Sequence, residues 1–195
     1  MNMDLQRVNV KFFAADGCGV ALDSFVGVFN SWIQHADGEY YDLADYGHVP
    51  EGPGVVLVAD EANVSIDNNG NRLGLLYNRK RPVDGTNGEK LAASVAAALG
   101  YCRRLEEEPA LGGRMHFRGD EALIIVNDRL VAPNNGEIFS ALKPEIEALA
   151  KSLYGGAAFT IEREQDPRKR FAVRIKAAGP VSIKTLLESL RKNVN

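Results

Sequence analysis

Three short motifs occur twice along this chain in the same order, and this repetition constrains the fold more than any other feature. The pairs are Asp60-Glu61-Ala62 with Asp120-Glu121-Ala122, Asn71-Arg72-Leu73 with Asp128-Arg129-Leu130, and Asn87-Gly88-Glu89 with Asn135-Gly136-Glu137. Around each set, an apolar segment, an acidic turn, a second apolar segment and a polar loop precede a helical pattern. The sequence therefore predicts a duplicated unit, a β-hairpin followed by a helix, within residues 55–108 and 113–155.

Residues 1–54 predict a β-α-β segment ahead of the duplicated units. Apolar residues alternate over residues 8–13, as in a half-buried strand, and the turn-rich Asp16-Gly17-Cys18-Gly19 ends it. Three- and four-residue apolar spacings from Leu22 to Ile33 predict an amphipathic helix, and residues 40–46 predict a second strand. The turn at residues 16–19 lacks the third glycine and the lysine of phosphate-binding loops, which favours a plain turn.

A third hairpin and helix are predicted at the end of the chain, around a turn at Gln165-Asp166-Pro167. This unit resembles the other two in form, but it lacks both the acidic turn and the Asn-Gly-Glu motif. In the second duplicated unit, Pro144 predicts a break near Lys143, because proline lacks an N–H and clashes with the preceding helical turn. We expect Pro144 to open a second helical piece.

These elements predict one compact domain, residues 1–195, of the α+β class. We expect a largely antiparallel mixed sheet with packed helices, built from internal units at 1–54, 55–112, 113–156 and 157–195, because no linker or low-complexity tract separates them. The side chains expected in the core, each on an apolar stripe or in an apolar strand, are Phe29, Trp32, Leu57, Leu99, Ile125 and Val173.

Composition excludes several classes of protein. The 45% hydrophobic and 25% charged content is that of a folded domain, and the net charge of −3 disfavours non-specific binding to nucleic acid or to an anionic membrane. We find no signal peptide and no apolar run long enough to span a membrane. The two cysteines, Cys18 and Cys102, form no CxxC motif, so we expect a reducing, cytoplasmic compartment.

The duplicated acidic turns suggest one possible metal site. Asp60, Glu61, Asp120 and Glu121 could hold a divalent cation if a pseudo-twofold axis relates the two copies, since hard cations prefer oxygen ligands. Acidic residues are also ordinary turn chemistry, and a duplicated hairpin duplicates its turn without any ligand. We favour the structural interpretation and expect no metal and no cofactor.

The loop from His48 to Gly54 is the best candidate for chemistry. It presents His48 beside Asp42 and Asp45, and a carboxylate can orient an imidazole ring for acid-base work or metal binding. Arg79, in the cluster Arg79-Lys80-Arg81, is a further candidate for binding a ligand. The spacing matches no metal signature, and histidines in surface loops are common, so no residue is assigned as catalytic.

The sequence is consistent with two functions. A duplicated scaffold without a convergent catalytic set favours a non-enzymatic binding or assembly module, whose partner is a protein or a small molecule. The alternative is a small enzyme or ligand-binding protein with its site around the His48 loop. Three basic clusters, at residues 79–81, 103–104 and 168–170, could meet an acidic partner only if they converge, and isolated clusters are more often solvated.

Overall fold

The computed structural model describes residues 3–192, in which eight strands form one sheet and four α-helices pack on it. The strands are β1 (Val8–Ala14), β2 (Tyr40–Tyr46), β3 (Gly54–Ala59), β4 (Ala62–Asp67), β5 (Gly74–Arg79), β6 (Phe117–Val126), β7 (Phe159–Arg163) and β8 (Ala172–Ala177). The helices are α1 (Leu22–His35), α2 (Asn87–Glu106), α3 (Gly136–Tyr154) and α4 (Ile183–Lys192), with 3-10 turns η1 (Asn69–Asn71) and η2 (Pro109–Leu111).

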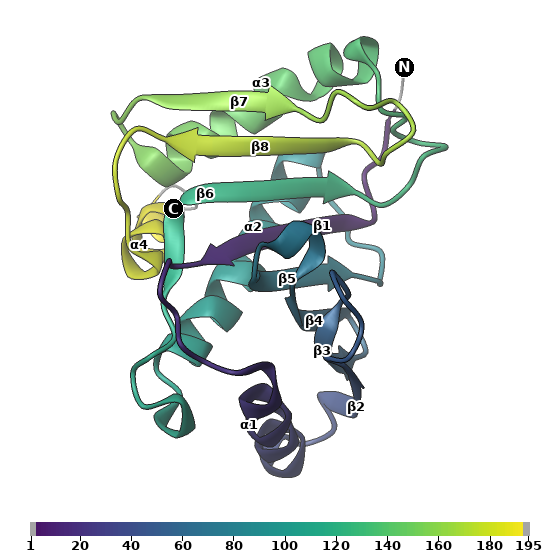
Figure 1. Ribbon diagram of the computed structural model, residues 1–195. Helices are drawn as coiled ribbons and strands as arrows, with labels where there is room; N and C mark the ends of the chain where they lie inside the picture. The colour runs from purple at the N-terminus through teal and green to yellow at the C-terminus, as the bar shows by residue number, and fades with distance from the viewer. Residues whose placement is uncertain (1–2, 193–195) are drawn as a thin grey trace.

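The strands run in the order β2-β3-β4-β5-β1-β6-β8-β7, and every neighbouring pair is antiparallel. The α+β class is therefore confirmed, although the sheet contains no parallel pair among the described strands. β1 lies in the middle, between segments that are far away in the sequence, while β2 and β7 form the two edges (Figure 1). None of the helices described between residues 3 and 192 is long and apolar enough to cross a bilayer.

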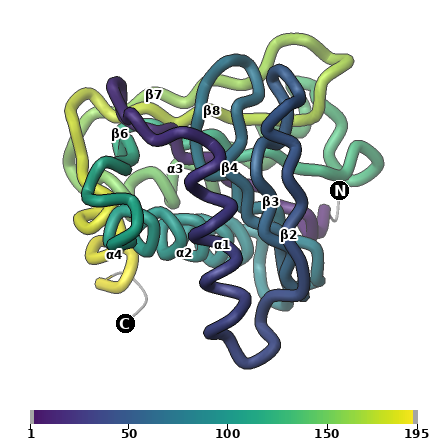
Figure 2. Tube along the Cα trace, turned by 60° about the horizontal axis from the view of Figure 1, so that its bottom comes forward, coloured from purple at the N-terminus to yellow at the C-terminus, as the bar shows by residue number. Residues whose placement is uncertain are grey.

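All four helices lie on one face of the sheet, and the core fills the space between them. α2 crosses β1 and β5, α1 covers β2 and β3, and α4 packs beside α2 (Figure 2). Phe29, Trp32, Leu57, Leu99 and Val173 are buried as the apolar pattern predicts. The opposite face, which we call the open face, carries no α-helix of residues 3–192.

Local sequence explains where the longest helices begin. Thr86 caps α2 with a capping box, in which its hydroxyl accepts from the N–H of Glu89 and the Glu89 carboxylate accepts from the N–H of Thr86. Asn135 caps α3 by accepting from the N–H of Ile138. The two Asn-Gly-Glu motifs thus both open helices, but Asn87 is the first residue of α2 whereas Asn135 is the N-cap of α3.

The duplication is not borne out by the architecture. Asp60 and Glu61 form the tight turn between β3 and β4, as predicted, but Asp120 and Glu121 lie inside the single ten-residue strand β6. The first unit therefore contains three strands and a helix, and the second contains one strand and a helix. An extended backbone carries β6 through the predicted turn, because its residues pair with β1 on one side and with β8 on the other.

Two further expectations are wrong for tertiary reasons. α3 is one continuous helix with Pro144 inside it, and no break occurs near Lys143. Its apolar stripe, which includes Leu142 and Ile146, is buried on both sides of the proline and holds the two halves together. Ile125 is only half-buried, because alternation along β6 turns it toward the open face while Ile124 and Val126 enter the core.

Candidate functional site

The open face of the sheet is polar at its centre, and much of that polarity is buried. Most of the polar or charged residues described as buried lie on this face of the central strands, and they are Asn9, Lys11, Ser65, Asp67 and Glu121. Strand alternation places them there, since their neighbours in sequence enter the core under the helices. Burial of ionised groups costs free energy unless they are paired, so this concentration of buried polar groups makes the open face the candidate site.

Glu121 is the most tightly held group on this face. Its carboxylate accepts hydrogen bonds from both terminal nitrogens of Arg72, at 2.7 and 2.9 Å, and a further one from Nη1 of Arg174. These contacts lower the pKa of Glu121 to about 2, Arg72 contributing most, and they prevail over the opposing effect of burial. Both guanidinium groups also lie over the ring of Phe13, at 3.6 Å for Arg72 and 5.8 Å for Arg174.

Lys11 and Asp67 form a second buried ion pair beside this cluster. The Lys11 ammonium lies 2.5 Å from the Asp67 carboxylate, and both side chains are about 5% exposed or less. Burial lowers the pKa of Lys11 from its ordinary value, although the Asp67 carboxylate acts in the opposite direction. Asp67 also accepts from the N–H of Asn69 at 3.3 Å, so the pair is joined to the η1 turn at the rim of the face.

A groove of about 650 Å³ lies over these residues, between the η1 turn on one side and the loop that joins β7 to β8 on the other. Its apolar floor comes from β1, β5, β6 and β8, and consists of Phe13, Leu76, Leu123, Ile125 and Ala172. Leu76, Lys11, Leu123 and Arg174 are successive cross-strand neighbours. Three strand spacings separate the first from the last, so the groove is roughly 14 Å wide.

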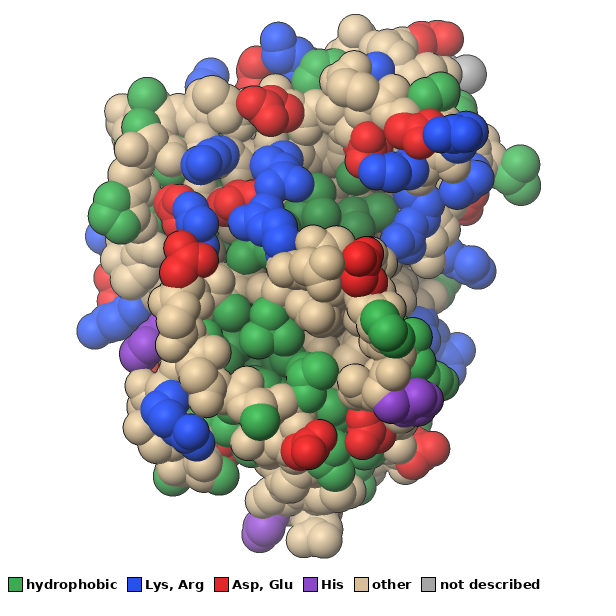
Figure 3. All heavy atoms as spheres, viewed as in Figure 1, with side chains coloured by type: hydrophobic (Ala, Val, Ile, Leu, Met, Phe, Trp, Pro, Cys, Tyr) green, Lys and Arg blue, Asp and Glu red, His purple; other side chains and the backbone are tan. Residues whose placement is uncertain are grey.

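Cationic side chains dominate the walls of the groove. They number eight, against the three carboxylates Asp67, Glu162 and Glu164, and they are Lys11, Arg72, Arg129, Arg163, Arg168, Lys169, Arg170 and Arg174. The lining thus has an excess of five positive charges, or four when the underlying Glu121 is included. Lys and Arg side chains gather around a hydrophobic floor in the upper half of Figure 3.

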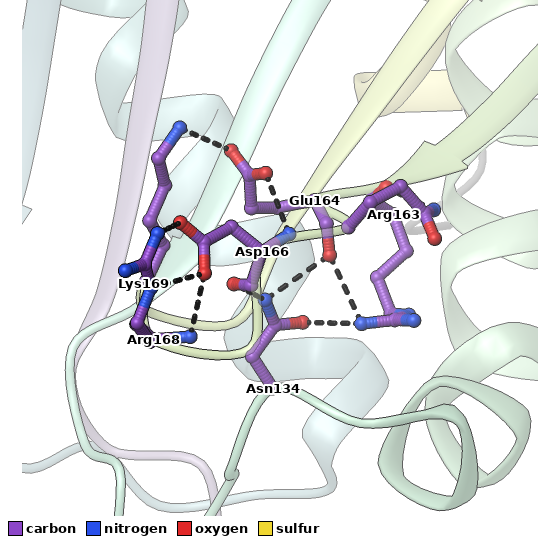
Figure 4. Close-up of polar contacts among 7 residues, drawn as sticks. Asn134, Arg163, Glu164, Asp166, Arg168 and Lys169 are labelled. Atoms are coloured by element: carbon purple, nitrogen blue, oxygen red, sulfur yellow. Dashed lines mark hydrogen bonds and ion pairs between the residues drawn. The ribbon is translucent and has the colours of Figure 1, made fainter.

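The β7–β8 loop is held in a defined shape by Asn134, a buried residue from the loop before α3 (Figure 4). Its amide nitrogen donates to the carbonyl oxygens of Glu164 and Asp166, at 3.1 and 2.8 Å, and its amide oxygen accepts from Arg163 at 2.8 Å. Arg168 in turn donates to the Asp166 carboxylate. These contacts hold Arg163 and Arg168 in defined positions on this wall.

The structure places Arg79 away from the other residues that the sequence suggested as a site. His48 is exposed in the loop between β2 and β3. Arg79 ends β5 at the opposite end of the strands, roughly 17 Å away when measured along the strand direction. Asp42 and Asp45 are three residues apart on β2, so they point to opposite faces of the sheet. Their carboxylates accept only from nearby backbone, the N–H of Leu43 and of Gly47, in the described part of the chain.

Only one of the three basic clusters of the sequence reaches the groove. Residues 168–170 converge there with five cations that the sequence did not group with them. Arg81 instead pairs with Asp60 beside the β3–β4 turn, and Arg104 lies over the ring of Trp32 at 3.8 Å. One sequence signal could have pointed to the groove: residues 123–126 are apolar on both faces, so a helix-free face must expose half of them.

Three of the four acidic residues of the repeated motif are bound to arginines. Asp60 pairs with Arg81, Asp120 with Arg118, and Glu121 with Arg72 and Arg174. Between residues 3 and 192, no three His, Cys, Asp or Glu side chains are grouped in a way that could hold a metal ion.

Comparisons with known proteins identify no relative of this chain. No family model matches it, and neither the curated proteins nor the solved structures include a significant match.

Proposed function

We propose that this protein is a binding module whose groove on the open face holds a small anionic ligand with a flat apolar part. The observation that carries the proposal is the segregation of charge. The full chain has a net charge of −3 while the groove lining has a net charge of +5, so the residues outside the groove carry −8. Such a distribution concentrates anions at one place on the surface.

The size of the groove favours a small molecule. Its volume of about 650 Å³ lies within the range of small-molecule sites, and an apolar floor with a few polar groups around it is their usual construction. A long polyanion such as nucleic acid would extend beyond the groove over an acidic surface, which opposes its binding. A ligand the size of a nucleotide avoids that surface.

The cationic side chains of the groove walls differ in how firmly other residues hold them. Arg72 and Arg174 are shared with Glu121 and are 36% and 39% exposed, so they can meet a ligand without leaving the carboxylate. Arg168 is 89% exposed and tied only to Asp166. Arg129 is exposed and makes no ion pair with the described residues. Planar guanidinium groups favour phosphate and carboxylate groups, which they bind in a bidentate manner.

Calorimetric titration with three probes tests the proposal: adenosine triphosphate, tripolyphosphate and adenosine. We expect adenosine triphosphate to bind most tightly, tripolyphosphate more weakly, and adenosine weakest, with an affinity for both anions that falls as salt is added. The variant Arg129→Ala/Arg168→Ala/Lys169→Ala removes three exposed cations and should weaken binding of the anions about tenfold or more, since each contact contributes roughly 0.5 kcal/mol or more.

A matched control distinguishes the groove from overall charge. Lys184, Arg191 and Lys192 are exposed on α4, on the helix-covered side of the sheet, and Lys184→Ala/Arg191→Ala/Lys192→Ala, which also removes three cations, should leave the affinity unchanged. Failure of both anions to bind, or an equal loss of affinity in the two triple variants, would contradict a ligand site in the groove.

A further inference from the structure

β2 is an edge strand whose outer side pairs with no other strand in the part of the chain that the structure describes. It pairs with β3 on one side only, and it is the last strand at that end of the sheet (Figure 1). N–H and C=O groups alternate in direction along a strand, so seven residues leave about three of each pointing outward. Such a row of backbone groups is a template for the addition of a further strand.

The side chains around this edge are those of a binding surface. Tyr41, Tyr46 and Val49 are 60%, 44% and 41% exposed, and Leu130 is the remaining large hydrophobic residue described as exposed. Three of the four therefore gather on β2 and on the loop that follows it. Tyrosine is favoured in binding surfaces because its ring buries apolar area while its hydroxyl stays polar.

The edge is also strongly acidic. Residues 36–53 contain five carboxylates and no lysine or arginine, and the carboxylates are Asp37, Glu39, Asp42, Asp45 and Glu51. The lower right of Figure 3 shows acidic and hydrophobic side chains together over β2. The nearest cations belong to other elements: Arg104 donates to the hydroxyl of Tyr40, and Arg81 pairs with Asp60. The carboxylates of Asp42 and Asp45 have no cationic partner among residues 3–192.

β7, at the opposite edge of the sheet, is better protected against pairing with another strand than β2 is. β7 has five residues, carries Glu162 and Arg163 in succession, and is covered by α3, whose Tyr154 contacts the ring of Phe159. Short length and charges of both signs are the usual protection of an edge strand against pairing. β2 is longer and contains neither lysine nor proline, and its bulge, between Tyr40 and Asp42, is confined to its first residues, so Asp42 to Tyr46 pair regularly with β3.

We propose that β2 is a docking edge for an extended, basic segment of a partner protein, which joins the sheet as a further antiparallel or parallel strand. Its backbone would pair with the outer groups of β2. Because Asp42 and Asp45 point to opposite faces of the sheet, basic side chains on each face of the added strand would meet one of the two carboxylates, and apolar side chains would pack on Tyr41 and Tyr46. A second copy of this chain is the poorer occupant, because pairing β2 with itself brings four carboxylates together.

An octapeptide with the sequence Lys-Lys-Val-Val repeated twice is the probe, since it presents lysine and valine on both faces of a strand, and amide hydrogen exchange on the whole protein is the measurement. We expect the peptide to slow exchange at alternate amides within residues 40–46 and to leave the groove loop at residues 164–170 unaffected. The variant Asp42→Asn/Asp45→Asn should bind the peptide about three- to tenfold more weakly. The control Asp84→Asn/Glu188→Gln removes two exposed carboxylates elsewhere and should bind it as the parent does.

A peptide with the same side chains but with methylated backbone nitrogens separates strand addition from charge attraction. It keeps every charge and cannot donate backbone hydrogen bonds, so it should not protect the amides of β2. Equal binding of the methylated peptide would overturn strand addition. A concentration-dependent dimer in sedimentation, with the same β2 amides protected in the absence of peptide, would overturn the basic partner and assign the edge to a second copy.

Discussion

The replacement Glu121→Gln tests the electrostatic centre of the open face, because it removes one charge while keeping the shape of the side chain. In the folded protein Glu121 binds Arg72 and Arg174, and its pKa falls from 4.5 to about 2. A shift of this size corresponds to about 3 kcal/mol of stability as an upper bound. Solvent reaches both guanidinium groups, which are 36% and 39% exposed, and this screening reduces the expected value to about 1–2 kcal/mol.

The sign of the pH dependence follows from the direction of the shift. Because the pKa of Glu121 is lower in the folded than in the unfolded chain, its ionised form stabilises the fold above about pH 4.5. This contribution is lost as the pH falls from 4.5 toward about 2. We therefore expect Glu121→Gln to unfold more easily than the parent at neutral pH, and the difference to shrink through that window.

Urea denaturation of both proteins at a series of pH values measures this difference. The control is Glu188→Gln, which removes an exposed carboxylate on α4 and should change the free energy of unfolding by no more than about 0.5 kcal/mol at any pH. A constant difference between Glu121→Gln and the parent from neutral pH down to pH 2 would refute the ion-pair reasoning. The variant also frees two arginines, so its affinity for tripolyphosphate should rise.

Four further predictions concern the fold and the groove. Gly54 has φ +63°, and a Cβ at this position would lie 1.9 Å from the carbonyl oxygen of Ile66. Gly54→Ala should therefore lower the free energy of unfolding in urea by more than about 2 kcal/mol. The control Gly27→Ala, in the open surroundings of α1, should not destabilise the protein. Leu57→Ala should cost about 2–5 kcal/mol, because Leu57 is fully buried; a loss below about 0.5 kcal/mol would show that β3 is peripheral to the core. Burial raises the pKa of Cys102, so in thiol titration of the native protein Cys102 should react far more slowly than the half-buried Cys18. Asn134→Ala removes one of the two donors to each of the carbonyls of Glu164 and Asp166, which keep Arg163 and the N–H of Lys169, and it removes an acceptor of Arg163. The loss of these three hydrogen bonds should cost about 1–3 kcal/mol and speed amide exchange in residues 164–170, and unchanged exchange there would contradict the role of Asn134 in the loop.

The secondary structure of this chain can largely be predicted from its sequence, because local periodicity and helix capping determine it. The spacing from Leu22 to Ile33 predicts α1, and the bounds expected for β2 agree with those observed. The Asn-Gly-Glu motifs mark the starts of α2 and α3, since Thr86 and Asn135 cap free backbone N–H groups there. The α+β class follows from these elements alone.

The sequence could not show which strands are neighbours, because strand pairing depends on contacts between segments far apart in the chain. Residues 120 and 121 have the composition of a turn, yet β1 and β8 pair with β6 on both sides and keep it extended. The repeated motifs therefore occupy different structural positions, and they do not define a repeated unit.

The same long-range order creates the groove. Lys11, Arg72, Glu121 and Arg174 come from four separate parts of the chain, and they meet only because β1 lies between β5 and β6, with β8 next to β6. The sequence alone determined that Lys11 lies in a strand and that residues 123–126 are apolar on both faces, whereas it placed Glu121 in a turn. Tertiary structure alone decided that one of the two faces of β6 would be left without a helix and surrounded by cations, because packing of all four helices on one side of the sheet exposes the other.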